Sequence, residues 1–338
     1  MNQFLISSSE FQNKSAESGA HGHATRSSPL AAVQALESHD WGGKTINLLR
    51  LAAAGFAVPP LVAISAQVFR QLVDRHPEIR RLLQELDGPR SANLEAVAQQ
   101  LREAFRAAEF PPELRDELSE RLRVSQLSEA SVAVRSSASD EDGADFSFAG
   151  MHDSFLFVQG FEQILVAAKN VWASAFQSRA LAYRLENKIP LDRLGVSVIV
   201  QQMIQAQTSG VVFTINPANN RTDQLLVSSV WGAGEGLVSG ALPADTFVVD
   251  KSSGEVQAEV VEKTHRVELD REKKHGSRTV VVPVPQQTAP TLSNEQIQEV
   301  ASVSQQIERH YRRPQDIEFC FDGSGKLFVV QTRPVTRV

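Results

Sequence analysis

Four polar side chains follow a regular pattern near the end of the chain, in the segment QDIEFCFDGSGKLFVVQTRP (315–334). Two apolar runs joined by a Gly-containing turn predict a β-hairpin. Residues two apart on a strand point to the same face, so Asp316 and Glu318 are expected to project together. If the turn contains an even number of residues, pairing brings Gln331 and Arg333 to the face of the two carboxylates.

That face has the chemistry of a site for a phosphate group and a metal ion. Two adjacent carboxylates repel each other unless a cation lies between them, and Mg²⁺ with oxygen ligands is the usual solution. A guanidinium beside them suits the charge spread over phosphate oxygens. The spacing alone fits equally well an exposed strand face whose acids pair with neighbouring lysines.

The elements that must position this hairpin change in character along the chain. Residues 1–35 are rich in Ser, Ala, Gly and His without periodicity, which predicts a disordered extension. Residues 36–190 have apolar residues at helical spacing and two short strands, 131–137 and 154–158, flanking a polar loop. Residues 191–338 are rich in strand patterns. We therefore expect an α+β protein of two lobes with a cleft between them.

Local patterns within the lobes predict individual elements. Apolar spacing predicts helices over 44–54 and about 161–187. The β-rich runs at 195–204 and 209–217 are separated by a short polar turn, which predicts a hairpin. The segment LSNEQIQEVASVSQQIERHY (292–311) begins with an N-cap pattern and predicts one amphipathic helix.

Composition argues against several classes of function. The chain has 338 residues, of which 42% are hydrophobic and 22% charged, as in ordinary globular proteins. A net charge of −6 argues against broad binding to nucleic acid or to anionic membranes. The single cysteine, Cys320, allows neither a disulfide framework nor a Cys-based zinc site within one chain. No stretch approaches the roughly 18 apolar residues of a membrane helix and no secretory signal is visible, so we expect a cytoplasmic protein.

Four earlier segments carry further motifs: GGKTINLLRLAAAGFAVPP (42–60), VAVRSSASDEDGADFSFAGMHDSF (132–155), VIVQQMIQAQTSGVVFTINP (198–217) and VSSVWGAGEGLVSGALPADTFVVDK (227–251). Together with the hairpin, and in this order, these segments resemble the nucleotide-binding domain of the phosphoenolpyruvate synthase and pyruvate phosphate dikinase family, which includes rifampicin phosphotransferase. The resemblance implies an ATP-grasp fold that binds ATP with Mg²⁺. It also implies transfer of a phosphoryl group to a histidine on a separate swivelling domain.

The resemblance implies catalytic roles for four residues. Lys44 in GGK and Arg135 in VRSS resemble the cationic contacts to phosphate. Asp316 resembles a catalytic acidic position, and Arg333 lies near the terminal phosphates. Lys44 is also placed at a predicted helix start, where free backbone N–H groups favour anions.

A second group of positions resembles the metal and nucleotide contacts of the family. Glu318 and Gln331 resemble the positions that hold the metal ion. The positions that resemble contacts to the nucleotide are Gly150, Gln202, Met203, Ile204 and Glu235. Within this set the glycine lies in a loop expected to act as a lid, the residues at 202–204 contact adenine through the backbone, and the glutamate holds the ribose hydroxyls.

Each motif taken alone has an ordinary explanation. GGK is typical of many turns before helices, Arg135 fits a surface ion pair, and GAGEG fits a flexible turn at a strand end. Met203 and Phe213 fit core positions better than nucleotide-stacking positions. His152 in the lid loop is not favoured as a phosphoryl acceptor, because the acceptor histidine of the family lies in a Gly-Gly and Cys-containing motif that this chain lacks. The joint occurrence of the motifs favours the functional interpretation.

The chain departs from the family at its end. It stops soon after Arg333, where the family continues into a phosphohistidine domain and a barrel that handles pyruvate or phosphoenolpyruvate. We therefore expect two ATP-grasp lobes, 36–190 and 191–338, that act on a histidine-bearing partner or belong to a longer protein. The alternative is a non-catalytic nucleotide-binding or interaction module.

Overall fold

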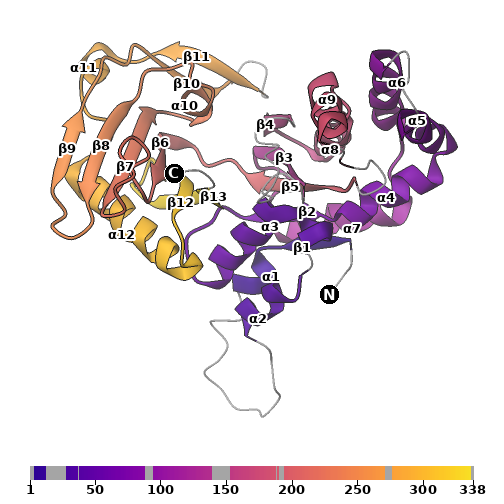
Figure 1. Cartoon of the computed structure of the whole chain (residues 1–338), viewed down its shortest axis with the longest axis horizontal. Coiled ribbons are helices and arrows are strands. Elements are labelled where there is room, and N and C mark those ends of the chain that lie inside the picture. Colours follow the sequence, from indigo (N-terminus) through magenta and orange to yellow (C-terminus); the bar gives the residue numbers. More distant parts are fainter. Residues whose placement is uncertain are drawn as a thin grey trace. The chain divides into compact units, whose positions relative to one another are not determined.

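The chain folds into two compact units, each with its own large sheet (Figure 1). The computed structural model describes residues 4–12, 28–36, 38–87, 94–138, 153–187, 189, 194–270 and 276–335. The first unit comprises Met1–Ala53 and Pro60–Met203, and the second comprises Ala54–Pro59 and Ile204–Val338. Both units combine helices with antiparallel strands, which confirms the predicted α+β class. Among the described helices, none has the length and apolar character needed to cross a bilayer.

A five-stranded antiparallel sheet forms the centre of the first unit. In order of pairing, its strands are β1 (Leu5–Ser7), β2 (Leu61–Ile64), β5 (Val196–Gln202), β3 (Val132–Ala138) and β4 (Ser154–Val158). The middle strand, β5, is buried along almost its whole length. Its valine and isoleucine residues suit a strand that packs on both faces.

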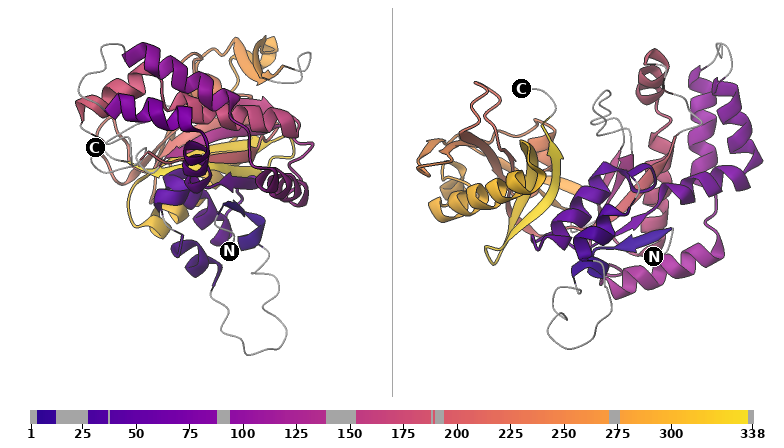
Figure 2. Two further views of the ribbon diagram at one scale, coloured as in Figure 1. Left: turned by 90° about the vertical axis from the view of Figure 1, so that its right-hand side faces the viewer. Right: turned by 60° about the horizontal axis from the view of Figure 1, so that its bottom comes forward.

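The helices of the first unit pack against this sheet or against one another (Figure 2). In the described part of the chain they are α1 (Ser9–Gln12), α2 (Pro29–Gln34), α3 (Ser38–Ala53), α4 (Ala66–Arg75), α5 (Pro77–Asp87), α6 (Leu94–Ala107), α7 (Pro112–Val124), α8 (Phe161–Ser174) and α9 (Ser178–Glu186). Both α3 and α8 pack against β3 and β5. Ring centroids of Phe69 and Phe105 lie 5.1 Å apart, as do those of Phe105 and Phe176, so a stack of rings joins α4 and α6 to the connection between α8 and α9.

The prediction of a disordered extension over residues 1–35 is wrong where the structure describes that segment. Strand β1 pairs with β2, with Leu5 opposite Ile64. Leu5 and Ile6 are 1% exposed and Phe11 is fully buried. A three-residue edge strand carries too short an apolar pattern to stand out within a polar window. Residues 1–3 and 13–27 lie outside the described residues.

The predicted single helix over 161–187 is two helices. Helix α8 ends at Ser174 and α9 begins at Ser178. The backbone N–H of Ala175 bonds to the carbonyl of Trp172 in a tightened last turn. The following Phe176 is fully buried in the ring stack, so tertiary packing ends α8 where no glycine or proline marks the break.

The predicted hairpin between the runs at 195–204 and 209–217 is also wrong. Strand β5 pairs with β2 and β3, whereas β6 (Ala206–Phe213) pairs with β7 (Gln224–Trp231) and β12 (Gln315–Asp322). The short polar segment between the runs leads from one unit to the other, because the units change between Met203 and Ile204. The sequence placed the boundary between the lobes earlier, between residues 190 and 191.

A six-stranded antiparallel sheet forms the centre of the second unit. In order of pairing, its strands are β13 (Leu327–Pro334), β12, β6, β7, β8 (Asp245–Asp250) and β9 (Val256–Glu259). The described part of this unit also contains β10 (His265–Leu269) paired with β11 (Ser277–Val281), and the helices α10 (Glu235–Val238), α11 (Val284–Gln287) and α12 (Asn294–Tyr311).

Helix α12 packs against β12 on one face of this sheet. Ser293 is its N-cap, and Ser293 and Gln296 form a reciprocal capping box, which confirms the predicted helix start. Ile317 and Phe319 of β12 are almost fully buried. Their neighbours Asp316 and Glu318 therefore lie on the other face of the sheet, because side chains alternate along a strand.

Residues 54–59 belong to the second unit although both flanking segments belong to the first. The backbone N–H of Val329 donates a 2.8 Å hydrogen bond to the carbonyl of Ala57. The ring of Phe56 lies 6.4 Å from that of His310 in an edge-to-face arrangement. This segment thus adds a backbone contact along β13, the edge strand of the sheet.

Replacing Leu5 by alanine is expected to destabilise the first unit by about 2–5 kcal/mol, the usual effect of truncating a buried leucine. The residue is 1% exposed and belongs to the core, so a cavity would remain. Urea unfolding measures the change, with Val124→Ala, at a residue 59% exposed, as the control that should alter stability by less than about 0.5 kcal/mol. Equal effects of the two changes would contradict the placement of β1.

Candidate active site

A glycine with positive φ lies just before Lys44 in the first unit. Gly42 has φ 71° and ψ 162°, which interrupts α3, and the helix continues after it. A Cβ atom at this position would lie 2.0 Å from the carbonyl oxygen of Ser137 in β3. Only glycine allows both this conformation and this contact. The GGK segment is therefore pressed against β3, with Lys44 in the first turn of the continuing helix.

The structure brings the two predicted cations of the first unit to the same strand. Lys44 is half-buried, and its Nζ lies 3.4 Å from the carbonyl oxygen of Ser136. Arg135 is half-buried and precedes this residue on β3. Arg135 and Ser137 are two apart and share the face of β3 against which α3 packs. A lysine, an arginine and a helix start in one place favour an anion.

The four polar residues of the C-terminal hairpin lie opposite one another in pairs. Asp316 is paired with Arg333 and Glu318 with Gln331, so the four side chains share one face. The even-numbered turn on which the sequence analysis made this conditional is absent, because Phe321 is paired with Leu327 across five residues. The register shifts by one residue between Glu318 and Phe319. Nearer the turn, Phe319 is opposite Val329, so an unshifted hairpin would place Val330 opposite Glu318.

Asp316 and Arg333 form an ion pair across the hairpin. The Nε and one terminal nitrogen of Arg333 each lie 2.8 Å from Oδ2 of Asp316. The carboxylate side chain is 10% exposed and the guanidinium side chain 41% exposed. Burial raises the pKa of Asp316, and the charge of Glu318 adds to the rise, while Arg333 opposes both effects. The buried carboxylate thus carries a free-energy penalty that a further cation would relieve.

The polar face of the hairpin has the oxygen donors that a Mg²⁺ ion prefers. Asp316, Glu318 and Gln331 supply oxygen atoms on one face, the ligand type that Mg²⁺ prefers. In the described part of the chain, no three His, Cys, Asp or Glu side chains form a preformed metal cage. Mg²⁺ is usually bound by one or two carboxylates together with phosphate oxygens, so this smaller donor set suits it.

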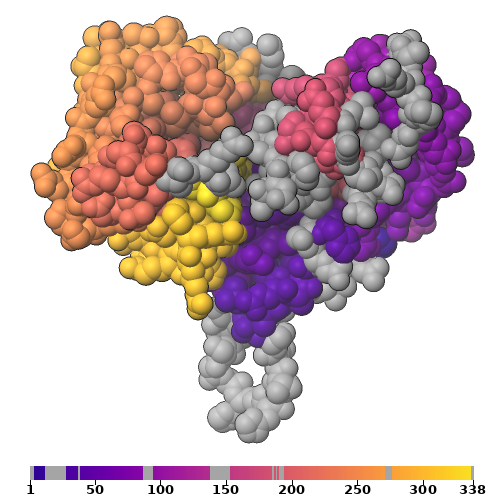
Figure 3. Space-filling view, in the orientation of Figure 1, coloured from indigo at the N-terminus to yellow at the C-terminus, as the bar shows by residue number. Residues whose placement is uncertain are grey.

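Apolar side chains of β6 border the carboxylates. Phe213 is opposite Asp316 and Val211 opposite Glu318, and both are half-buried. Phe213 is therefore a half-buried residue on the face that carries the carboxylates. Parts of the C-terminal segment, yellow in the space-filling view, are on the visible surface in Figure 3.

The predicted nucleotide contacts are distributed over several segments. Glu235 is exposed and begins α10, after a glycine turn that follows β7. The backbone N–H groups of Gln202 and Met203 bond to the carbonyls of Pro60 and Ser131, at 2.8 Å each, within the first unit. Ile204 begins the second unit. Gly150 and the expected lid loop lie outside the described residues.

Sequence reasoning missed two buried serines that contact the GGK segment. Ser137 in β3 and Ser197 in β5 both place their hydroxyl oxygens at the carbonyl of Trp41. The second serine of VRSS was the only available signal, since Ser197 is distant in sequence from the segment that it touches.

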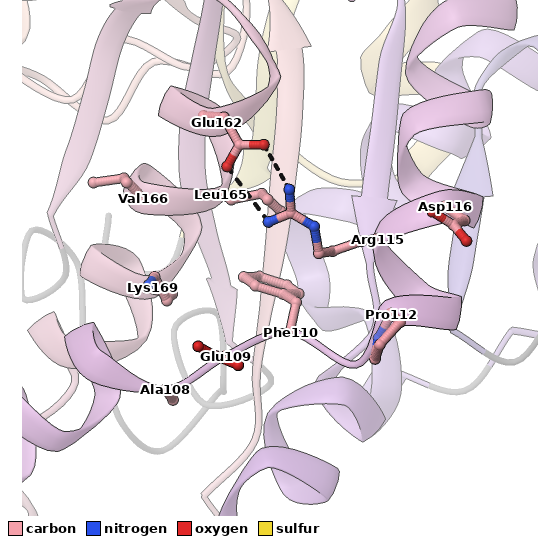
Figure 4. Close-up of a pocket in the computed structure, with 10 residues that line it drawn as sticks. All are labelled: Ala108, Glu109, Phe110, Pro112, Arg115, Asp116, Glu162, Leu165, Val166 and Lys169. Carbon is pink, nitrogen blue, oxygen red and sulfur yellow. Dashed lines mark hydrogen bonds and ion pairs between the residues drawn. The ribbon is translucent and has the colours of Figure 1, made fainter.

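A surface pocket in the first unit contains none of the predicted site residues (Figure 4). Its volume is about 510 Å³, and its lining residues are Ala108, Glu109, Phe110, Pro112, Arg115, Asp116, Glu162, Leu165, Val166 and Lys169. The guanidinium of Arg115 is paired with Glu162 at 2.6 Å and lies over the ring of Phe161. The mixed charges of this lining select no particular ligand.

The chain matches the family described as pyruvate phosphate dikinase, AMP/ATP-binding domain, over residues 39–338. It is therefore a nucleotide-binding domain of the α+β class. More specifically, it belongs to the pyruvate phosphate dikinase AMP/ATP-binding domain family, as the resemblance of the five segments implied.

Individual relatives agree with this assignment. Phosphoenolpyruvate synthase of Escherichia coli (strain K12) is 37% identical over 317 residues, which cover 87% of this chain and 40% of that protein. A probable phosphoenolpyruvate synthase of Pyrococcus abyssi is 33% identical and is covered to 42%. The prodigiosin synthesizing transferase PigC of Serratia marcescens is 33% identical over 91% of this chain and is covered to 33%. The chain thus spans about two fifths of the length of the first two relatives.

A weaker likeness connects the chain with a solved structure, that of D-alanyl-alanine synthetase A from Vibrio cholerae. It has a TM-score of 0.30 and 12% sequence identity, and it covers 72% of this chain and 56% of the other. A likeness at this level decides nothing about the fold.

Replacing Asp316 by asparagine is expected to stabilise the ligand-free chain at pH 7. Because the pKa of Asp316 is raised in the folded chain, this carboxyl stabilises the fold fully below the ordinary aspartate pKa of about 3.9. That stabilisation is lost as the pH rises through the raised pKa. The amide removes this penalty at neutral pH. Urea unfolding measures the free energy of unfolding of the variant and of the wild type. The stability that the variant gains at pH 7 should be smaller at about pH 3.5.

Asp322 in the same hairpin provides a control, because its substitution should change the stability in the opposite direction. Hydrogen bonds from the Ser324 hydroxyl and the Lys326 backbone N–H lower the pKa of Asp322. Its contribution is therefore present above the ordinary aspartate pKa and is lost as the pH falls. Asp322→Asn should destabilise the chain at pH 7. Stability changes of the same sign in both variants would contradict the assignment of a buried, penalised carboxylate to Asp316.

Proposed function

We propose that the chain binds Mg-ATP and transfers a phosphoryl group to a histidine on a separate swivelling domain or partner protein. The family assignment supports ATP as the ligand. The observation that carries the proposal is the hairpin register, which aligns Asp316 with Arg333 and Glu318 with Gln331 on one face. A structural ion pair alone would not need a second carboxylate and an amide beside it.

In this proposal charged side chains and a metal ion neutralise the charge of the triphosphate. Lys44 and Arg135 bind phosphate oxygens, and the helix start at Lys44 adds N–H dipoles. Asp316, Glu318 and Gln331 would hold Mg²⁺, which supplies Lewis-acid stabilisation of the transferring phosphate. Glu235 would hold the ribose and the backbone at 202–204 the adenine, and Gly150 would belong to the lid. These residues together would make an ATP-grasp site.

Arg333 has two roles in the proposal. Without nucleotide it neutralises Asp316 through the two 2.8 Å contacts. Its guanidinium is 41% exposed, so it can also contact a phosphate oxygen of the nucleotide. During transfer, the phosphorus–oxygen bond of the nucleotide breaks and its electron pair stays on the leaving oxygen, while a phosphorus–nitrogen bond forms to the acceptor imidazole. A site that excludes water protects the group from hydrolysis.

The partner follows from the family rather than from this chain. A histidine-bearing domain would carry the phosphoryl group onward, and a cytoplasmic setting fits the need for ATP. Because the chain spans only part of its relatives, the final acceptor is left to experiment.

Calorimetry with Mg-ATP tests the binding step. Arg135→Ala and Arg333→Ala should each weaken binding about tenfold to a hundredfold, because a charge-assisted contact to phosphate is lost. Arg123→Ala is the matched control, since that exposed arginine pairs only locally with Glu120 in the described structure, and it should leave the affinity unchanged. A wild-type chain that binds no Mg-ATP would overturn the proposal.

Mass spectrometry tests the transfer step. The chain is incubated with ATP, Mg²⁺ and a swivelling domain from a relative, and phosphohistidine is expected to appear on the partner. Transfer of one phosphoryl group leaves ADP in solution, whereas transfer of a diphosphoryl group whose terminal phosphoryl then passes to water or phosphate leaves AMP, so the nucleotide product distinguishes the two routes. A chain that binds ATP but never phosphorylates the partner would instead be a non-catalytic nucleotide-binding module.

A further inference from the structure

Two buried hydroxyl groups converge on the carbonyl oxygen of Trp41, just before the GGK segment. Ser137 Oγ lies 3.0 Å from this oxygen and Ser197 Oγ lies 2.6 Å from it. Ser197 Oγ also lies 2.6 Å from the carbonyl oxygen of Ser137, so its single proton is shared between two acceptors. Both serines are at most 1% exposed.

The hydroxyl of Ser137 is inserted into a helical hydrogen bond. In an uninterrupted α3, the N–H of Thr45 would donate to the carbonyl of Trp41, four residues earlier. Instead Thr45 N–H donates to Ser137 Oγ at 3.0 Å, and Ser137 Oγ donates to Trp41 O. A side chain inserted in this way produces a sharp kink. The positive φ of Gly42 and its contact with Ser137 are part of the same arrangement.

A second set of contacts fixes the residues before the kink. Asp40 is buried and accepts hydrogen bonds from Gln67 Nε2 at 2.7 Å and from Arg70. Its carbonyl oxygen accepts from Ser65 Oγ at 3.3 Å. Helix α4 and the residue that caps it thus hold one side of the kink, while β3 and β5 hold the other side.

We propose that Ser137 and Ser197 are positioning residues that set the direction of Lys44 toward phosphate. The inference rests on the proposed function, in which Lys44 binds the triphosphate. The kink decides where the helix resumes and hence where the lysine stem begins. Neither serine hydroxyl needs to touch the nucleotide, because both act through the backbone on either side of Gly42.

A double-mutant cycle on Mg-ATP affinity tests this role. Ser137→Ala and Ser197→Ala should each weaken Mg-ATP binding about fivefold, as expected for loss of one hydrogen bond that aligns a charged group. Their affinity for adenosine should stay unchanged, since adenosine has no phosphate for Lys44 to bind. In a Lys44→Ala background, either serine change should cause no further loss of Mg-ATP affinity.

Ser174→Ala is the matched control for removing a buried hydroxyl. Ser174 is 2% exposed, its Oγ donates to the carbonyl of Val171 at 2.7 Å in α8, and it accepts from the backbone N–H of Asp153 at 3.1 Å. None of these contacts involves the residues around Trp41. This change should lower stability but leave Mg-ATP affinity unchanged. If an alanine variant fails to fold, the nearly isosteric Ser→Cys change at the same position retains volume while weakening the hydrogen bond, and it should show the same selective loss.

The outcomes separate this inference from the proposed function. A wild-type chain that does not bind Mg-ATP would overturn the proposed function itself. If Lys44→Ala weakens binding but the serine variants behave like Ser174→Ala, the serines are structural only and the inference is wrong. It is also wrong if the losses from Lys44→Ala and Ser197→Ala add, because independent effects would mean that the serine does not act through the lysine.

Discussion

The candidate site depends on a one-residue shift in the pairing of β12 with β13. From the turn, the hairpin pairs Phe321 with Leu327 and Phe319 with Val329. Because side chains alternate, continuing that register would turn Gln331 and Arg333 away from the two carboxylates. The bulge at Val330 restores them to the carboxylate face. Bulges re-aim side chains in this way, and here the result is an arginine aligned with a buried aspartate.

This alignment lowers the stability of the folded chain. A carboxylate that is nearly buried beside another carboxylate is disfavoured in its charged form, and one partly exposed guanidinium only partly compensates. The first unit shows a related compromise at Gly42, where a regular helical hydrogen bond is replaced by one through a side chain. Both irregularities lie at predicted phosphate-binding residues, where departures from local rules are expected.

The sequence predicted what local patterns determine. Alternation placed Asp316 and Glu318 on one face, and the Ser293 capping pattern marked the start of α12. It did not predict the bulge, because nothing around Val330 distinguishes a bulged strand from a regular one. The separation of β5 from β6 depends on partners far away in sequence, as does the approach of Ser197 to Trp41. Such pairings arise from tertiary packing, which a short window of residues does not contain.

Residues 54–59 cover part of the sheet edge through which the second unit could pair with other chains. Strand β13 is an edge strand, and the carbonyl of Ala57 accepts a hydrogen bond from the backbone N–H of Val329 in this strand. Exposed edges are templates for pairing with other chains. A fragment beginning at Ile204 would lose this cover because residues 54–59 would stay with the other half. Expressed by itself, such a fragment would present an open strand edge and would tend to aggregate. The second unit therefore depends on residues 54–59, which come from an earlier part of the chain.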